Sequence, residues 1–210
     1  MNRPIAVIDY GMGNLRSVEK ALEVAGADSI VTSKPAEIEK CGKLVLPGVG
    51  SFGGAMKELK SRRLIGPIKD AIKSGKPFLG LCLGLQLLFE KSEEAPGVKG
   101  LGILAGEVKR FRPGELKVPH MGWNNIEIMG QRSDVRILNK IPDNSYMYFV
   151  HSYYVKPKDK SVVLTTTDYG IKFVSSVAMD SIYGLQFHPE KSQAMGLRIL
   201  KNFVHLRQQQ

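Results

Sequence analysis

Cys82 occupies the centre of the segment Gly80-Leu81-Cys82-Leu83-Gly84, with one glycine two residues before it and another two residues after it. Glycine lets the backbone turn sharply and leaves the central side chain uncovered. This spacing of two glycines around a central residue is typical of a nucleophile elbow between a strand and a helix. Amides at the start of a helix favour the thiolate form of a cysteine, and the thiolate is the nucleophile. The alternative is a structural cysteine, because a cysteine in an apolar segment usually belongs to a core.

A thiol nucleophile needs a base, and His188 lies in Gln186-Phe187-His188-Pro189-Glu190, at the end of a predicted strand. Residues two apart in an extended chain face the same side, and the intervening proline favours extended backbone, so Glu190 can reach the imidazole ring. Cys82, His188 and Glu190 thus predict a nucleophile, a base and an orienting carboxylate. Taken alone, His-Pro-Glu also fits a surface turn. His205 is expected to face solvent near the end of the last helix.

A glycine-rich segment, Pro47-Gly48-Val49-Gly50-Ser51, follows another apolar run and precedes a helical pattern. Its glycines free the backbone, so its N–H groups could point into the same crevice as Cys82. Together with the amide of Leu83, the amides of Val49 and Gly50 could bind a developing oxyanion. A tight strand-to-helix turn without a ligand is the alternative.

The elements that must position these residues alternate in the first half of the chain. Apolar runs typical of buried strands end at residues 8, 31, 46 and 81, and helical spacing of apolar residues covers 15–25 behind an Asn14 cap, 55–59, 64–72 and 83–89. Such alternation predicts a parallel sheet covered by helices. Ligands of such sheets bind beyond the carboxyl ends of the strands, where Cys82 would lie.

Beyond Glu107 the pattern changes to strand-like segments, at 146–150, 162–167, 172–178 and 182–187, which we expect to be largely antiparallel. A closing helix is expected over about 194–206. We find no internal repeat or linker. We therefore predict an α/β fold, a doubly wound mostly parallel sheet with an antiparallel extension, in a single domain over residues 1–210.

Composition narrows the classes of function. With 43% hydrophobic and 24% charged residues the chain is an ordinary globular protein. Its formal charge of +10 permits nucleic acid, an anionic membrane, a phosphorylated ligand or an acidic protein partner. The basic run at residues 57, 60, 62 and 63 is expected to be a solvated helix face. The longest uncharged stretch, 77–89, is shorter than the roughly 20 residues of a membrane helix, and no signal-peptide core is visible, so we expect no membrane and a cytoplasmic location.

Cofactor and metal motifs are not found. The two cysteines, Cys41 and Cys82, exclude a disulfide framework and a Cys-rich zinc site. The segment Gly11-Met12-Gly13-Asn14-Leu15-Arg16 resembles the start of a dinucleotide fingerprint, but an arginine stands at the third glycine position. We expect no metal, no cofactor and no nucleic acid.

The sequence resembles a known family, the class I (triad) glutamine amidotransferases. Two segments carry the resemblance: Gly80-Leu81-Cys82-Leu83-Gly84-Leu85-Gln86 and Gly184-Leu185-Gln186-Phe187-His188-Pro189-Glu190. Within that family, the segments 8–14, 47–52, 119–124 and 148–153 resemble the glutaminase subunits that serve histidine biosynthesis. The resemblance runs nearly from end to end. It implies that Cys82 attacks the side-chain amide of L-glutamine, that His188 carries the proton to the leaving ammonia, and that Glu190 holds the imidazole. Water then resolves a glutamyl thioester.

The resemblance also implies residues that hold the substrate and a partner. Besides the oxyanion amides, glutamine would be held by a residue one turn beyond the elbow, a carboxylate near the end of that helix, and two residues of a later strand: Gln86, Glu94, Ser152 and Tyr153. Ammonia would pass to a cyclase subunit shaped as a (β/α)₈ barrel, in a heterodimer. Its interface would include Asn14, His120, Met121, Trp123 and Asn124.

Three alternatives stay open. Trp123 could be a core aromatic residue. The chain could be a stand-alone hydrolase of small amides that uses the same triad, or a non-catalytic scaffold whose positive charge recruits nucleic acid.

Overall fold

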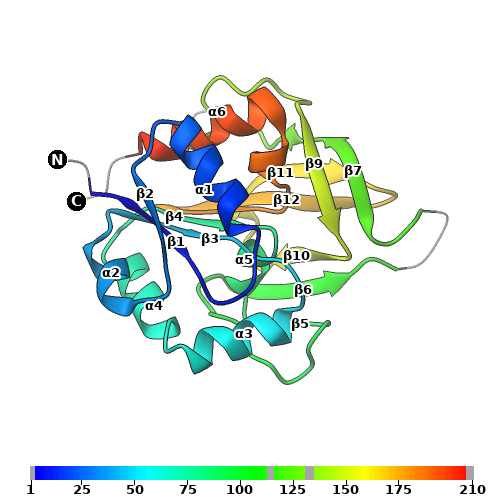
Figure 1. Ribbon diagram of the computed structural model, residues 1–210. Helices are drawn as coiled ribbons and strands as arrows, with labels where there is room; N and C mark the ends of the chain where they lie inside the picture. Colours follow the sequence, from blue (N-terminus) through cyan, green and yellow to red (C-terminus); the bar gives the residue numbers. More distant parts are fainter. Residues whose placement is uncertain (1–2, 113–115, 131–134, 207–210) are drawn as a thin grey trace.

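A central sheet with helices on both faces organises the computed structural model, which describes residues 3–112, 116–130 and 135–206 (Figure 1). Its strands run in the order β2, β1, β3, β4 and β13, all parallel. Their bounds are Ser29–Thr32, Ile5–Ile8, Lys43–Leu46, Phe78–Leu81 and Ile182–Leu185. Every residue of β1, β4 and β13 is buried, as expected of apolar strands covered on both faces.

An antiparallel extension continues the sheet past β13. It consists of β12 (Lys172–Met179), β10 (Tyr153–Pro157) and β6 (Gly106–Arg110), with β11 (Val163–Asp168) also paired to β12. The short strands β5 (Lys91–Ser92) and β8 (Glu127–Ile128) pair with β6 and β11. This confirms the predicted doubly wound, mostly parallel sheet with an antiparallel extension.

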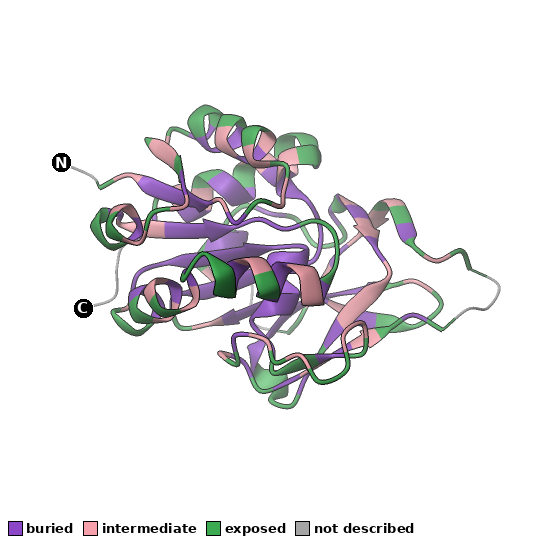
Figure 2. Cartoon of the chain, turned by 60° about the horizontal axis from the view of Figure 1, so that its bottom comes forward, coloured by how far each residue is buried: buried purple, intermediate pink, exposed green. Residues whose placement is uncertain are grey.

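The helices form a layer on each face of the sheet (Figure 1). On one face lie α1 (Leu15–Val24) and α6 (Gln193–Val204), with Leu22 and Phe203 among their fully buried side chains. On the other lie α2 (Pro35–Lys40), α3 (Phe52–Ser61), α4 (Ile65–Lys73) and α5 (Leu83–Leu87). Figure 2 shows the consequence: the central strands of the sheet are buried, and the helices expose their outer sides. Single-turn 3₁₀ helices occur at η2 (Arg136–Leu138), η3 (Lys160–Val162) and η4 (Pro189–Lys191).

A separate pair of antiparallel strands, β7 (His120–Asn125) and β9 (Tyr146–His151), lies beside the main sheet (Figure 1). Burial alternates along β9, where Met147 and Phe149 are buried and Tyr146 is exposed. The pair therefore has an inner face that packs on the domain and an outer face toward solvent.

Three local expectations from the sequence differ from the structure. The helix after Cys82 ends at Leu87, because the carbonyls of Leu87 and Leu88 accept amides from Leu101 and Ile103 instead of continuing the helix. Glu94 therefore lies in the loop after β5 and not near the end of that helix. Helix α1 begins directly after Asn14, as predicted, but the Asn14 side chain makes no capping hydrogen bond.

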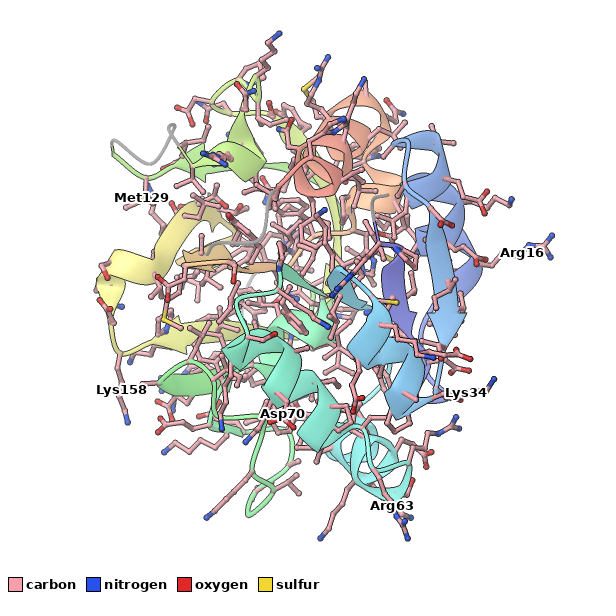
Figure 3. All side chains as sticks on the ribbon, turned by 90° about the vertical axis from the view of Figure 1, so that its left-hand side faces the viewer. Arg16, Lys34, Arg63, Asp70, Met129 and Lys158 are labelled. Carbon is pink, nitrogen blue, oxygen red and sulfur yellow. The ribbon has the colours of Figure 1, made fainter. Side chains whose placement is uncertain are left out.

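The positive charge is spread over the surface. Arg16, Lys34, Arg63 and Lys158 project outward from different parts of the fold in Figure 3. The four basic residues of the run, 57, 60, 62 and 63, are exposed, as expected of a solvated helix face. Within the described ranges, no helix is long and apolar enough to cross a membrane.

Candidate active site

Cys82 lies in the sharp turn between β4 and α5, at the carboxyl edge of the sheet. Its backbone has φ 52° and ψ −105°, a conformation that residues with a side chain rarely adopt. A methyl group on Gly84 would overlap the carbonyl oxygen of Leu46, and one on Gly80 would come 2.6 Å from the carbonyl oxygen of Gly84. The two glycines are therefore required by this turn, which has the strained form of a nucleophile elbow.

His188 and Glu190 form a buried pair after β13. The His188 Nδ1 atom lies 2.8 Å from Glu190 Oε1, and the two side chains are 6% and 2% exposed. Burial opposes charge on the imidazole, but the interactions with Cys82 and Glu190 outweigh it and raise the pKa of His188 to about 10. His188 Nε2 and Glu190 Oε2 are buried without a hydrogen-bond partner among the described residues. The ring is thus oriented by the carboxylate, and its second nitrogen is left for a reacting group.

A cavity of about 300 Å³ opens beside Cys82 and His188. The predicted oxyanion and substrate-binding residues all line it: Val49, Gly50, Leu83, Gln86, Glu94, Ser152 and Tyr153. Pro119, Val150 and His151 complete the wall. A larger hollow of about 950 Å³ lies over β6, β10 and β12, but its lining includes none of the predicted catalytic or substrate-binding residues. The smaller cavity is the candidate active site, because it holds the reactive side chains.

The glycine-rich loop packs directly on the elbow. A methyl group on Gly48 would come 2.8 Å from Leu83 Cβ and 2.6 Å from the Tyr10 hydroxyl oxygen. Glu94 Oε2 accepts a hydrogen bond of 2.7 Å from the amide of Phe52, which ties the loop to the far wall of the cavity. In the described part of the chain, the hydrogen bonds do not use the amides of Val49, Gly50 or Leu83. These donors remain available for a ligand.

Three buried features near the site were not predicted from the sequence. Gln186 is fully buried and its Nε2 atom lies 3.6 Å from Cys82 Sγ. Its place two residues before His188 on an extended segment is a signal that could have identified it. Tyr10 is fully buried with no hydrogen-bond partner for its hydroxyl within the described ranges, and burial together with the charge of Cys82 raises its pKa. The pairing of His120 with His151, at 3.0 Å, carried no sequence signal.

The predicted partner-facing residues divide into two groups. Met121 and Trp123 are 62% and 46% exposed, so Trp123 is not a core aromatic residue. Asn14 is exposed and Asn124 is partly exposed. His120, however, is only 2% exposed, since its ring is stacked between aromatic rings of its own chain. We correct that assignment, because a buried side chain cannot contact a partner.

The second cysteine, Cys41, is buried apart from this cavity. Cys41 is buried at the end of α2, where burial raises the pKa of its thiol. Within the described ranges, no group of three or more His, Cys, Asp or Glu side chains could hold a metal ion.

Comparison with known proteins agrees with this geometry. The family model "Glutamine amidotransferase class-I" matches residues 6–206. The imidazole glycerol phosphate synthase subunit HisH of Aquifex aeolicus is 54% identical over 198 residues, covering 94% of this chain and 94% of the relative. The subunit of the same name from Gloeothece citriformis is 53% identical over 204 residues, covering 96% and 95%.

Solved structures of low sequence identity share the fold. A crystal structure described as a glutamine amidotransferase superimposes with a TM-score of 0.74 at 19% identity, covering 96% of this chain and 99% of that one. The structure of PurLQS from Thermotoga maritima gives a TM-score of 0.74 at 17% identity, covering 97% and 98%.

Proposed function

This chain belongs to the class-I glutamine amidotransferase family, and we propose that it is the glutaminase subunit of an imidazole glycerol phosphate synthase. In this proposal it hydrolyses L-glutamine to glutamate and ammonia. The ammonia passes to a cyclase subunit that makes imidazole glycerol phosphate and AICAR in histidine biosynthesis. The observation that carries the proposal is a cavity lined by the elbow cysteine and by the histidine of a buried His-Glu pair.

The reaction follows from the positions of the three side chains. The thiolate of Cys82 attacks the carboxamide carbon of glutamine, and the amides of Leu83 and the glycine-rich loop bind the oxyanion that develops. With its pKa raised to about 10, His188 is protonated at neutral pH and gives its proton to the departing ammonia. A glutamyl thioester remains on Cys82. Water then attacks the thioester, His188 accepts a proton from that water, and glutamate leaves as the thiolate is restored.

Recognition of glutamine rests on the opposite wall of the cavity. Glu94 supplies a carboxylate that can pair with the α-ammonium group of the substrate while its Oε2 atom stays bonded to the amide of Phe52. Ser152 and Tyr153 line the cavity beside it and present backbone and side-chain polar groups. Gln86 lies underneath and is almost fully buried.

The partner in this proposal is a cyclase subunit with a (β/α)₈ barrel, and the assembly is a heterodimer. The outer face of β7 and β9, where Met121 and Trp123 are exposed, is the apolar part of the surface that it would cover. The charge of +10 favours an acidic docking surface. We assign the enzyme to the cytoplasm, in keeping with its two free thiols.

Glutamate release by the purified chain tests the proposal. It should be measured with the chain alone, with the cyclase subunit, and with the cyclase subunit plus its nucleotide substrate. We expect turnover only in the last mixture. Full activity of the chain alone would favour a stand-alone hydrolase, whereas no activity in any mixture would favour a non-catalytic scaffold.

A further inference from the structure

Gln186 connects the nucleophile to the floor of the cavity through buried hydrogen bonds. Its Nε2 atom lies 3.6 Å from Cys82 Sγ, and its Oε1 atom lies 3.2 Å from Gln86 Nε2. The same Gln86 nitrogen lies 3.1 Å from the carbonyl oxygen of Tyr153. Gln186 is fully buried, and Gln86 is 4% exposed, so water does not compete for these contacts.

The direction of each hydrogen bond in this series, from the Tyr153 carbonyl to Cys82, follows from which atoms can donate and which can only accept. A carbonyl oxygen can only accept, so the Gln86 atom that faces the carbonyl of Tyr153 must be the amide nitrogen. That nitrogen gives its second hydrogen to Gln186, and the Gln186 atom facing it must therefore be the oxygen. The remaining Gln186 atom, the NH₂ group, faces the sulfur of Cys82. Reversing the Gln186 amide would place two nitrogen donors against each other and an oxygen against the sulfur.

The carbonyl of Tyr153 is itself held from the other side. His151 Nδ1 lies 2.8 Å from it and must donate, so His151 Nε2 accepts from His120 Nδ1 at 3.0 Å. Burial lowers the pKa of His151 to about 3 and that of His120 to about 4, so both rings are neutral at neutral pH. Asn124 Nδ2 then lies 3.3 Å from His120 Nε2 and donates to it. Both lone pairs of the Tyr153 carbonyl are thus engaged, which fixes the acceptor that orients Gln86.

Opposing groups act on the sulfur of Cys82. The carbonyl oxygen of Val150 lies 3.8 Å from Sγ and can bond only a thiol, which has a hydrogen to donate. The Gln186 NH₂ group and a protonated His188 favour the thiolate, which accepts. We propose that Gln186 is a catalytic residue whose side-chain amide donates to Cys82 Sγ and holds the sulfur as the thiolate that attacks glutamine.

This inference rests on the proposed function, in which Cys82 is the nucleophile, and it adds a further group that touches the reacting atom. A hydrogen bond to a charged acceptor shifts an equilibrium by about tenfold or more. Removal of the Gln186 donor should therefore move the thiol–thiolate equilibrium by about one pH unit toward the thiol.

The test is the rate at which iodoacetamide alkylates Cys82 as a function of pH, in the full chain carrying Cys41→Ala so that one thiol remains. In Gln186→Met, which keeps the side-chain length and loses the donor, the pH of half-maximal rate should rise by about one unit. In Gln186→Glu, a carboxylate replaces the donor and the rise should be larger. The other titratable groups around the sulfur are the same in all three proteins: Tyr10, Glu94, His151, His188 and Glu190.

Steady-state kinetics in the complex with the cyclase subunit give a second readout. For Gln186→Met, kcat for glutamine should fall about tenfold at neutral pH and recover in part at higher pH, while KM changes less. A loss that arose only from damaged packing would not recover with pH.

Ser176→Ala is the matched control, because Ser176 is a fully buried polar residue on the neighbouring strand β12 whose hydroxyl bonds Thr165. It should alter stability without moving the alkylation profile. If Gln186→Met does not fold, Gln186→Asn keeps an amide that is too short to reach the sulfur and should give the same shift.

An unchanged alkylation profile in a folded Gln186 variant would overturn the inference. Failure of the proposed function has a different signature. In that case either the parent would show no glutamine turnover with the cyclase subunit or Cys82→Ala would retain turnover, whereas alkylation reports the contact between Gln186 and the sulfur whether or not the enzyme turns over.

Discussion

The cavity around Cys82 and the strand pair β7–β9 adjoin each other but are built in opposite ways. The cavity buries polar side chains, and Gln86, Gln186 and His188 are each at most 5% exposed. The outer face of β7–β9 exposes apolar ones, with Met121 62% and Tyr146 63% exposed. Polar groups are inside in one region, and apolar groups are outside in the other.

The difference shows which region is complete in a single chain. Buried polar groups are tolerated when they bond one another, and the glutamine amides of the cavity do so. A contiguous exposed apolar surface is typical of a face that another molecule covers. We therefore expect substitutions in the cavity to impair the chemistry, and substitutions on the outer face to be silent until a partner is present.

The largest expected effect separates the two buried cysteines. Cys82→Ala should lower glutamine turnover in the complex by about 10⁴-fold, because no other group can form the thioester. Cys41→Ala should leave turnover unchanged, since Cys41 lies at the end of α2 away from the cavity. Mass spectrometry after treatment with a glutamine-like electrophile should locate the adduct on Cys82. An adduct on Cys41 would remove the basis of the comparison.

The next effect distinguishes the proton carrier from its orienting partner. His188→Asn should reduce turnover by about 10²- to 10⁴-fold, because the departing ammonia loses its proton donor. Glu190→Gln should reduce it less, since an amide oxygen can still accept a hydrogen bond from Nδ1, which lies 2.8 Å from the carboxylate. Glutamate release in the complex measures both. Equal activity of His188→Asn and the parent would contradict this assignment.

Much of the cavity could be predicted from sequence because its constraints are local. The glycines around Cys82 are required because a side chain at either position would overlap backbone atoms, and the spacing of His188 and Glu190 follows from an extended chain. Glu94, which the resemblance places at the glutamine site, lines the cavity. The expectation that it lies near the end of the helix after Cys82 was wrong, because it lies in the loop after β5. That error arose because the carbonyls ending α5 bond to residues 101–104, a pairing that local sequence does not show.

The strand pair was harder to predict because its properties depend on pairing between distant segments. Residues 119–124 of the sequence do not show that His120 points inward while Met121 and Trp123 point outward. The register of β7 on β9 decides this, with His120 opposite His151 and Trp123 opposite Tyr148. Gln186 combines local and long-range information. Its place two residues before His188 is visible in the sequence, but its contact with Cys82 can be seen only in the tertiary structure.

The histidine pair that joins the two regions predicts an acid-sensitive stability. Burial lowers the folded-state pKa of His120 to about 4 and of His151 to about 3, below the value near 6.5 of an unfolded chain. Between about pH 4 and 6.5 the unfolded state then binds more protons, so the free energy of unfolding falls as pH decreases. His188, with its pKa raised to about 10, acts oppositely and contributes stability that is lost as pH rises toward 10.

Denaturant unfolding at pH 7.5 and pH 5 measures this effect. The parent should lose on the order of 2 kcal/mol on acidification, and His120→Asn should lose less. His205→Asn is the control, because His205 is exposed after α6 and its removal should not change the slope. If His120→Asn lost as much free energy of unfolding as the parent, burial would not be holding the His120 ring neutral.

The smallest effect on the free chain is expected on the outer face. Trp123 is 46% exposed and contacts Tyr148 edge-on with ring centroids 6.1 Å apart, so Trp123→Ala should cost less than about 1 kcal/mol of unfolding free energy. Phe149→Ala, on the inner face of the paired strand, removes a fully buried ring and should cost about 3 to 5 kcal/mol.

In the complex, Trp123→Ala should lower product formation from glutamine and leave product formation from added ammonium salt normal. Ammonia from the added salt reaches the cyclase subunit from solution, so it does not have to pass between the subunits. Thermal unfolding of the free chain and the two product assays test both halves. A large stability loss in Trp123→Ala would place this residue with the inner face, and equal loss with both nitrogen sources would remove its role at the interface.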